Sequence, residues 1–408
     1  MAPFHLHADP SFNYEILRAL SMARYGGAEV SEVLQVAGDI KPGDFESYYN
    51  AFNDLALHVK AQADLLDSSK NPISARDAYF RAATYFRNAD FFLHGHPNDP
   101  RLMTLWSQQT VAFDKAIALL PVPGERLVIK ADGFDVNAIF YRTETPGTTG
   151  NPKPTIIVGS GFDGAQEEVY HAFGIAALER GYNVITYEGP GQPLPRREQE
   201  AGFIHDWEKV VTPVVDYLVQ QPSVDAKRIA LIGWSMGGYL SVRAAAFEPR
   251  IACTAAVDGV YDVFAAFRSM LAPNLRSLYD TGDAAGFKEA AMSSLDKPET
   301  PTPFRWAITQ GLWSFNVHNP AELMEKVKAM TLGGGVADRV QCPVWVGEAV
   351  KDEFFRGQPP LVKEALGDRA TLVTLTEDDG ASAHCHVGAL SVANRHIFDW
   401  MGKVFERK

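Results

Sequence analysis

The stretch Arg228-Ile-Ala-Leu-Ile-Gly-Trp-Ser-Met-Gly-Gly238 decides the fold of this chain. Its apolar first half predicts a buried strand, and residues 239–247 behind it predict a helix. Between them, Gly233-Trp-Ser-Met-Gly237 matches the G-x-S-x-G pattern of a nucleophile elbow, a strained strand-to-helix turn that raises the serine hydroxyl above the sheet. We therefore predict a nucleophilic Ser235 on an α/β sheet, against the alternative of an ordinary serine in a glycine-rich turn.

Strand and helix patterns alternate on both sides of this stretch. A hairpin is expected at 125–130 and 134–141, and a final helix at 387–405. Further strands are expected at 155–159, 183–187, 251–257, 343–347 and 370–375, with helices at about 167–180 and 203–220. Alternation of this kind predicts the α/β class, with a mostly parallel sheet covered by helices on both faces.

Two regions have helical periodicity and no strand pattern. The first precedes Pro121, and the second separates the strands expected at 251–257 and 343–347 by more residues than a strand–helix connection needs. An insertion there would cover the carboxyl edge of the sheet, where ligands bind in open α/β folds. We expect an all-helical N-terminal region (1–120), a core in two parts (121–262 and 341–408) and a helical lid insertion (263–340).

Composition excludes several classes of protein. The 38 basic and 50 acidic residues give a net charge of −12, which argues against nucleic acids and anionic membranes as partners. Three cysteines are too few for a disulfide framework or a zinc site, and the loop at 188–193 lacks the spacing of a phosphate-binding loop. No signal peptide or membrane-spanning run is visible. We expect a cytoplasmic protein that acts on a small molecule, with no metal and no cofactor.

A serine nucleophile needs a base, and the base needs an acid that orients it. On this fold the chain order is serine, acid, histidine. Asp352 lies in the loop after the strand expected at 343–347 and is the predicted acid, in preference to Glu348 and Glu353. The base should follow the last strand, where His384 and His386 both occur. Because they are only two residues apart, either histidine could be the base.

An oxyanion hole needs two backbone N–H groups beside the nucleophile. One is expected from Met236, directly after the serine. The second is expected from Phe162, in the glycine-rich loop at 159–164 that follows the strand at 155–159.

With these segments assembled, the chain resembles one branch of the α/β hydrolases. The branch includes the pseudooxynicotine-type C–C hydrolases and the fungal hydrolases that shorten polyketide chains in pigment pathways. The matching segments are 89–95, Asp99-Pro100-Arg101, Gly161-Phe162-Asp163-Gly164, 188–192, the elbow, and Gly380-Ala381 before His384-Cys385. The chain departs from the branch at Pro193, where glycine is usual, and at His386, where a non-basic polar residue is commoner.

The resemblance favours His384 as the base and implies a role in secondary-metabolite or pigment biosynthesis. It implies cleavage of a carbon–carbon bond in a β-dicarbonyl substrate, a retro-Claisen reaction, and a homodimer through the N-terminal helices. A lidded carboxylesterase or lactonase, or a ring-forming acyltransferase, would use the same residues. A hydrolase fold reused as a non-catalytic ligand-binding protein is the further alternative.

Substrate selection is assigned to the helical regions. Two polar residues after the strand at 251–257, Asp258 and Tyr261, are expected to bind a polar group of the substrate. An aromatic enclosure is expected from Phe91, Phe92, Trp306, Trp313 and Phe315.

Overall fold

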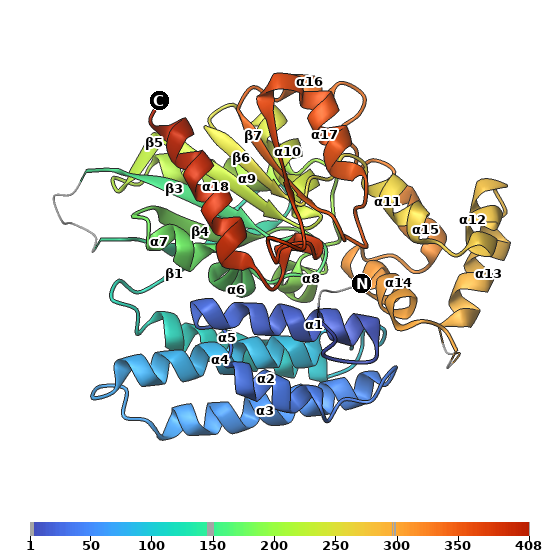
Figure 1. The fold of residues 1–408 in the computed structure, drawn as a ribbon, viewed down its shortest axis with the longest axis horizontal. Helices are drawn as coiled ribbons and strands as arrows, with labels where there is room; N and C mark the ends of the chain where they lie inside the picture. The colour runs from blue at the N-terminus through green and yellow to red at the C-terminus, as the bar shows by residue number, and fades with distance from the viewer. Residues whose placement is uncertain (1–3, 145–150, 296, 298, 408) are drawn as a thin grey trace.

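An eight-stranded sheet runs through the middle of the computed structural model, which describes residues 4–144, 151–295, 297 and 299–407 (Figure 1). The strand order is β1-β2-β4-β3-β5-β6-β7-β8. The first two strands pair antiparallel, β2 pairs antiparallel with β4, and the remaining pairs are parallel. The expected class is therefore confirmed. The strands are β1 (Glu125–Lys130), β2 (Asp135–Tyr141), β3 (Lys153–Gly159), β4 (Asn183–Glu188), β5 (Val224–Trp234), β6 (Cys253–Val257), β7 (Val344–Ala349) and β8 (Ala370–Leu375).

Helices cover both faces of the sheet, as the apolar strands require. Alternate residues of one strand enter different cores: Ile156 and Val158 of β3 belong to one, and Ile157 to the other. The first core is covered by α6 (Gln166–Val169), the π-helical turn η2 (Tyr170–Gly174), α7 (Ile175–Leu178) and α18 (Leu390–Phe405). The second is covered by α9 (Glu208–Val219), α10 (Gly237–Phe247) and α17 (Gln358–Leu366), while α8 (Pro193–Glu198) lies near the β2 and β4 ends.

The N-terminal helices form a layer beside the sheet and its first core (Figure 1). They share that core, since Phe80 of α4 packs on Tyr170 of the π turn with ring centroids 5.5 Å apart. The carboxylate of Asp9 caps α1 by accepting from the N–H groups of Ser11 and Phe12. The layer contains α1 (Pro10–Ser21), η1 (Met22–Tyr25), α2 (Val30–Ala37), α3 (Phe45–Leu65), α4 (Pro72–Asp90) and α5 (Arg101–Ile117).

The insertion expected to form a lid, residues 263–340, leaves the sheet after β6 and returns to it before β7, and is called the lid below. Its two ends are paired: Val263 N–H donates to the Met330 carbonyl (3.0 Å), and Leu332 N–H donates to the Tyr261 carbonyl (2.8 Å). The lid also reaches the N-terminal layer, because the Thr302 hydroxyl donates to Asp9 (2.5 Å). Its helices are α11 (Val263–Met270), α12 (Pro273–Asp280), α13 (Ala284–Ser294), α14 (Thr302–Ser314), α15 (Pro320–Val327) and α16 (Val336–Arg339).

Three helix boundaries differ from those expected. The helix at 167–180 is divided by the π turn η2, and the helix at 203–220 begins only at Glu208. The final helix begins at Leu390 and not at residue 387, because Gly388 has a positive φ of 92°. The short turn η4 (His384–His386) precedes it. Among the described residues, no helix combines the length and apolar character needed to cross a membrane.

Candidate active site

The turn between β5 and α10 has the geometry of a nucleophile elbow. Ser235 has a φ of +62°, a conformation that non-glycine residues rarely adopt. A Cβ at Gly233 would lie 1.9 Å from the Gly237 carbonyl oxygen, and one at Gly238 would lie 1.8 Å from the Asp258 carbonyl oxygen. Only glycine fits at both positions, so the strained turn is held by its surroundings and presents the Ser235 hydroxyl above the sheet.

A chain of hydrogen bonds connects this hydroxyl to an acid. Ser235 Oγ lies 3.0 Å from His384 Nε2, and His384 Nδ1 lies 3.0 Å from Asp352 Oδ2. The other carboxylate oxygen of Asp352 accepts from the N–H groups of Phe354 and Phe355, at 2.7 and 3.0 Å, which fixes its orientation. With Nδ1–H donated to the carboxylate, Nε2 is free to take the serine proton.

Of the other residues considered from the sequence, Glu353 lines the cavity described below, while His386 and Glu348 lie elsewhere. His386 is fully buried, and its Nδ1 lies 2.8 Å from the Ala381 carbonyl oxygen. The carboxylate of Glu348 accepts from the hydroxyl of Thr374 on the neighbouring strand β8. Of the two histidines, the structure brings His384 to Ser235.

Asp258 joins the site in a way that sequence reasoning missed. Its Oδ2 lies 2.9 Å from His384 Nδ1 and accepts from the Cys385 N–H at 2.7 Å. The side chain is fully buried and does not line the cavity, so the expectation that it binds a substrate polar group is corrected. The sequence did contain a signal for this position, since Asp258 comes directly after β6. Parallel neighbouring strands bring their carboxyl ends to one edge of the sheet, so a residue there can reach the same histidine as Asp352.

Burial and mutual charge set the protonation of these groups. Burial is the largest single influence on His384 and lowers its pKa. The charge of Asp352, together with Cys385, Tyr14 and the hydrogen bond of Asp258, outweighs burial and raises that pKa well above its usual value. Burial opposes ionisation of Asp352, yet the charge and hydrogen bond of His384 hold the pKa of Asp352 below its usual range. Burial, and then the charge of Asp352, raise the pKa of Asp258. Of the two acids, Asp352 is therefore the one that ionises more readily, and Asp258 the one that keeps a proton more readily.

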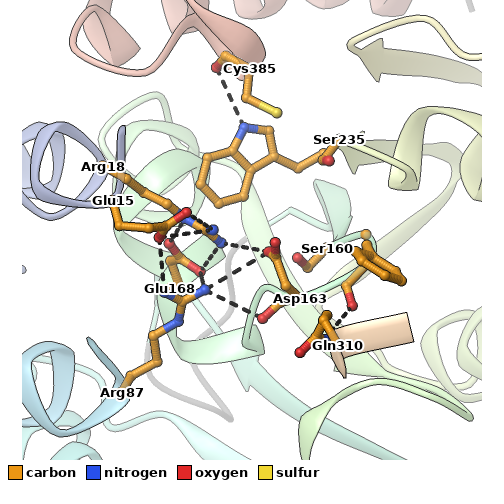
Figure 2. Close-up of polar contacts among 12 residues, drawn as sticks. Glu15, Arg18, Arg87, Ser160, Asp163, Glu168, Ser235, Gln310 and Cys385 are labelled. Carbon is orange, nitrogen blue, oxygen red and sulfur yellow. Dashed lines mark hydrogen bonds and ion pairs between the residues drawn. The ribbon is translucent and has the colours of Figure 1, made fainter. Parts of the chain in front are cut away.

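The loop that contains Phe162 packs directly on the elbow. A Cβ at Gly161 would lie 2.7 Å from both the Met236 nitrogen and the Trp234 carbonyl oxygen, so this approach requires glycine. Gln310 of the lid donates to the Phe162 carbonyl at 3.0 Å (Figure 2). The residues expected to supply the oxyanion hole thus lie on two contacting loops, one of them held by the lid.

A cavity of about 620 Å³ opens beside Ser235 and His384. The N-terminal layer, the core and the lid all contribute to its wall, which is mainly apolar. Of the expected aromatic residues, Phe91, Phe92 and Trp306 line it. The lid adds Phe267, Met270, Leu271, Leu275, Phe287, Phe304, Leu323 and Met324.

Three expected contacts are corrected. Trp313 lies seven residues beyond Trp306, about 10 Å further along α14, and its ring stacks on His94 with centroids 4.0 Å apart. Phe315 packs on Phe203, with ring centroids 5.1 Å apart. Neither these two residues nor Tyr261 line the cavity.

Sequence reasoning also missed wall residues from α1, among them Tyr14, Glu15 and Arg18. The periodicity of α1 is that of any amphipathic helix, and only the packing of the N-terminal layer brings it to Ser235.

Asp258, His384 and Cys385 place their potential ligand atoms within 4.8 Å of one another. Both ring nitrogens of His384 are already hydrogen-bonded, to Asp352 and to Ser235. Burial raises the pKa of the Cys385 thiol to about 12, which keeps it protonated, whereas a metal binds the thiolate. The cluster therefore suits a hydrogen-bonded site better than a metal ion.

Comparison with known proteins gives matches along the whole chain. A family model described as PET hydrolase-like matches residues 113–293. The 20-hydroxy-prefusarin hydrolase FUS2 of Gibberella moniliformis is 32% identical, over 98% of each chain. Hydrolase acrC of Aspergillus aculeatus is 31% identical over 99% of each, and hydrolase ORFZ of Pyricularia oryzae is 32% identical over 98% of each.

Two solved structures share the fold. The 2,6-dihydroxy-pseudo-oxynicotine hydrolase superposes with a TM-score of 0.73 at 22% identity, covering 94% of this chain and 95% of its own. AbyA5 superposes with a TM-score of 0.62 at 17% identity, covering 92% of this chain and 95% of its own.

Proposed function

This chain belongs to the family of α/β hydrolases that includes the fungal enzymes FUS2, acrC and ORFZ, and we propose that it cleaves a carbon–carbon bond of an apolar β-dicarbonyl substrate with Ser235 as nucleophile. The observation that carries the proposal is the hydrogen-bonded series Ser235–His384–Asp352 at the wall of a mainly apolar cavity. The choice of a carbon–carbon bond follows from the resemblance of the sequence motifs. A polyketide is the substrate class that fits both this chemistry and the mainly apolar cavity.

The first half of the reaction forms an acyl-enzyme. His384 Nε2 takes the proton of Ser235 as Oγ bonds to a ketone carbon, and the N–H groups of Met236 and Phe162 hold the resulting alkoxide. When the alkoxide collapses, the carbon–carbon bond breaks and its electron pair leaves as an enolate. The His384 imidazolium returns its proton to that enolate, which releases a ketone.

The second half restores the enzyme. Water attacks the acyl carbon and gives its proton to His384, and the second tetrahedral intermediate expels Ser235 Oγ, which recovers the proton. The sum is one β-diketone and one water converted to one carboxylic acid and one ketone. Asp352 keeps the imidazole oriented and stabilises its charge in both halves.

The test compares two substrates and two variants. The purified wild type, Ser235→Ala and the control Ser269→Ala are incubated with a linear β-polyketone and with an aryl ester. Ser269 lies on α11, outside the cavity lining. We expect acid and ketone fragments from the polyketone, loss of about 10⁴-fold or more in kcat with Ser235→Ala, and wild-type rates with the control.

Turnover retained by Ser235→Ala would refute the nucleophile. Rapid ester hydrolysis with no acid released from the polyketone would instead identify a lidded esterase, and an intramolecular ester product would identify an acyltransferase.

A further inference from the structure

One face of α1 brings polar groups to the wall of an otherwise mainly apolar cavity. Tyr14 and Glu15 lie three and four residues after Ser11 and four and three before Arg18, and all four residues line it. The Tyr14 hydroxyl donates to the His384 carbonyl oxygen at 3.3 Å. This face therefore lies close to the proposed base.

The other end of the same face lies against Trp234, in the strand end that leads into the elbow. The guanidinium of Arg18 is 5.1 Å from the ring centroid of Trp234, the residue before Ser235. Figure 2 shows Arg18 within a group of charged side chains.

The charges come from four segments of the chain: Glu15 and Arg18 from α1, Arg87 from α4, Asp163 from the loop after β3, and Glu168 from α6. Arg18 binds Glu168 at 2.5 and 2.7 Å and Asp163 at 3.0 Å, and Arg87 binds Glu168 at 3.2 Å. The contacts of Glu15 are longer, 3.4 Å to Arg18 and 3.6 Å to Arg87. Of the three carboxyl groups, Glu15 is held least firmly.

The charge balance of the group also indicates that Glu15 is the carboxyl group that takes up a proton most readily. Three carboxylates against two arginines would leave a surplus negative charge in a buried place, which is unfavourable. Burial raises the pKa of Glu15 to about 7, with Asp163 and Glu168 adding to the rise and both arginines opposing it. The nearby phenols stay neutral, since burial raises the pKa of Tyr14 and of Tyr48. Below neutral pH, Glu15 therefore offers an O–H group at the cavity wall.

We propose that Glu15 and Arg18 form a subsite for the second, uncharged carbonyl oxygen of the substrate while Ser235 attacks the first carbonyl carbon. This inference rests on the proposed function. A carboxylate would be repelled at the subsite by Asp163 and Glu168, whereas a carbonyl oxygen accepts hydrogen bonds from the carboxyl O–H and the guanidinium.

The subsite supplies its main stabilisation during bond cleavage. As the carbon–carbon bond breaks, its electron pair moves onto the second carbonyl and gives that oxygen the charge of an enolate. Donors already aimed at this oxygen bind it more strongly then than in the ground state. His384 remains the source of the proton that reaches carbon, so Glu15 keeps its own.

The experiment uses Glu15→Leu, Glu15→Gln and the control Glu32→Gln. Glu32 lies on α2, pairs with Arg81 at 3.1 Å and does not line the cavity. Each protein is assayed with an alkyl 1,3-diketone and with a 4-nitrophenyl ester of equal chain length, which lacks the second ketone.

We expect Glu15→Leu to lower kcat/KM for the diketone by about 10- to 100-fold and to lower the ester rate by a clearly smaller factor. Glutamine still donates a hydrogen bond but does not titrate. Both substrates share the rise in rate that follows deprotonation of His384. In the wild type, the ratio of kcat/KM for the diketone to kcat/KM for the ester should therefore fall as pH rises through about 7 and Glu15 loses its proton, and Glu15→Gln should lack this decline. Glu32→Gln should behave as the wild type.

Equal losses for both substrates in Glu15→Leu, or a wild-type decline retained in Glu15→Gln, would overturn the subsite and leave the Ser235 mechanism intact. If Glu15→Leu does not fold, the pH profile of Glu15→Gln decides alone. A wild type that leaves the diketone uncleaved overturns both this inference and the proposed reaction.

Discussion

Asp258 and Asp352 place their Oδ2 atoms at nearly equal distances from one nitrogen, His384 Nδ1, at 2.9 and 3.0 Å. They reach it from the ends of the adjacent strands β6 and β7. Two buried carboxyl groups this close do not both ionise. Since the pKa of Asp258 is raised and that of Asp352 is lowered, the negative charge of the pair resides preferentially on Asp352.

The first prediction separates these two acids. Asp352→Asn removes the charge that stabilises the imidazolium, so we expect kcat to fall by about 10³- to 10⁴-fold. Asp258→Asn keeps a neutral group of the same shape, and a loss of about 10-fold or less is expected. Steady-state kinetics of both variants test this, with thermal unfolding to show that both are folded. A larger loss in Asp258→Asn would reverse the assignment.

The second prediction distinguishes the two histidines. His384→Ala should abolish turnover with little change in unfolding temperature. His386→Ala should act on stability, because a fully buried ring that packs near Trp345 and bonds to Ala381 is lost, at a cost of about 1–3 kcal/mol. Calorimetry and kinetics on the same preparations provide the comparison. Full activity in His384→Ala would identify a different base.

The third prediction concerns pH. His384 must be unprotonated to accept the serine proton, and Asp352 raises its pKa above the usual value of 6.5. The rate of ester hydrolysis should therefore increase with pH through a midpoint above 6.5, and this limb should move to lower pH in Asp352→Asn. A midpoint that stays in place in the variant would show that Asp352 does not set the charge of the base.

The fourth prediction concerns the contact between the elbow and the Phe162 loop. Gly161→Ala forces a Cβ to 2.7 Å from the Met236 nitrogen, so one of the two proposed oxyanion donors must move. We expect kcat to fall by about 10²-fold or more while KM changes less. Gly38→Ala is the matched control, because its Cβ would meet nothing closer than 3.4 Å. An unchanged kcat in Gly161→Ala would remove this loop from the mechanism.

The fifth prediction concerns the lid's hold on that loop. Gln310 donates to the Phe162 carbonyl and contacts His94 at 2.5 Å, and His94 in turn contacts Asp90 at 3.0 Å. Gln310→Leu should lower kcat more than it raises KM, because Phe162 loses its support although the cavity wall is unchanged. Crystal structures of the variant would show a displaced 159–164 loop; an undisturbed loop with normal kcat would contradict the prediction.

The predictable parts of this site are those set by local chemistry. The elbow requires glycines within three residues of Ser235, and strand order predicts the loops that hold Asp352 and the base, while the choice of His384 over His386 comes from the family resemblance. The prediction for Asp258 is wrong because the sequence does not tell which of two adjacent loop ends lies beneath the imidazole. Trp313 shares a helix face with Trp306, so the sequence gives both the same expected role. The cavity extends to Trp306 and ends before Trp313, which the sequence does not reveal. Glu15 lies 220 residues before the serine, in a helix whose pattern is that of ordinary core packing.

The paired ends of the lid have an evolutionary consequence. Because Val263 bonds to Met330 and Tyr261 bonds to Leu332, the insertion is closed at its base, beside the directly paired strands β6 and β7. Its helices can therefore lengthen or shorten without separating these strands, provided that Gln310 keeps its bond to the Phe162 loop. Lids grafted from homologues that retain this glutamine are a direct route to new substrate ranges.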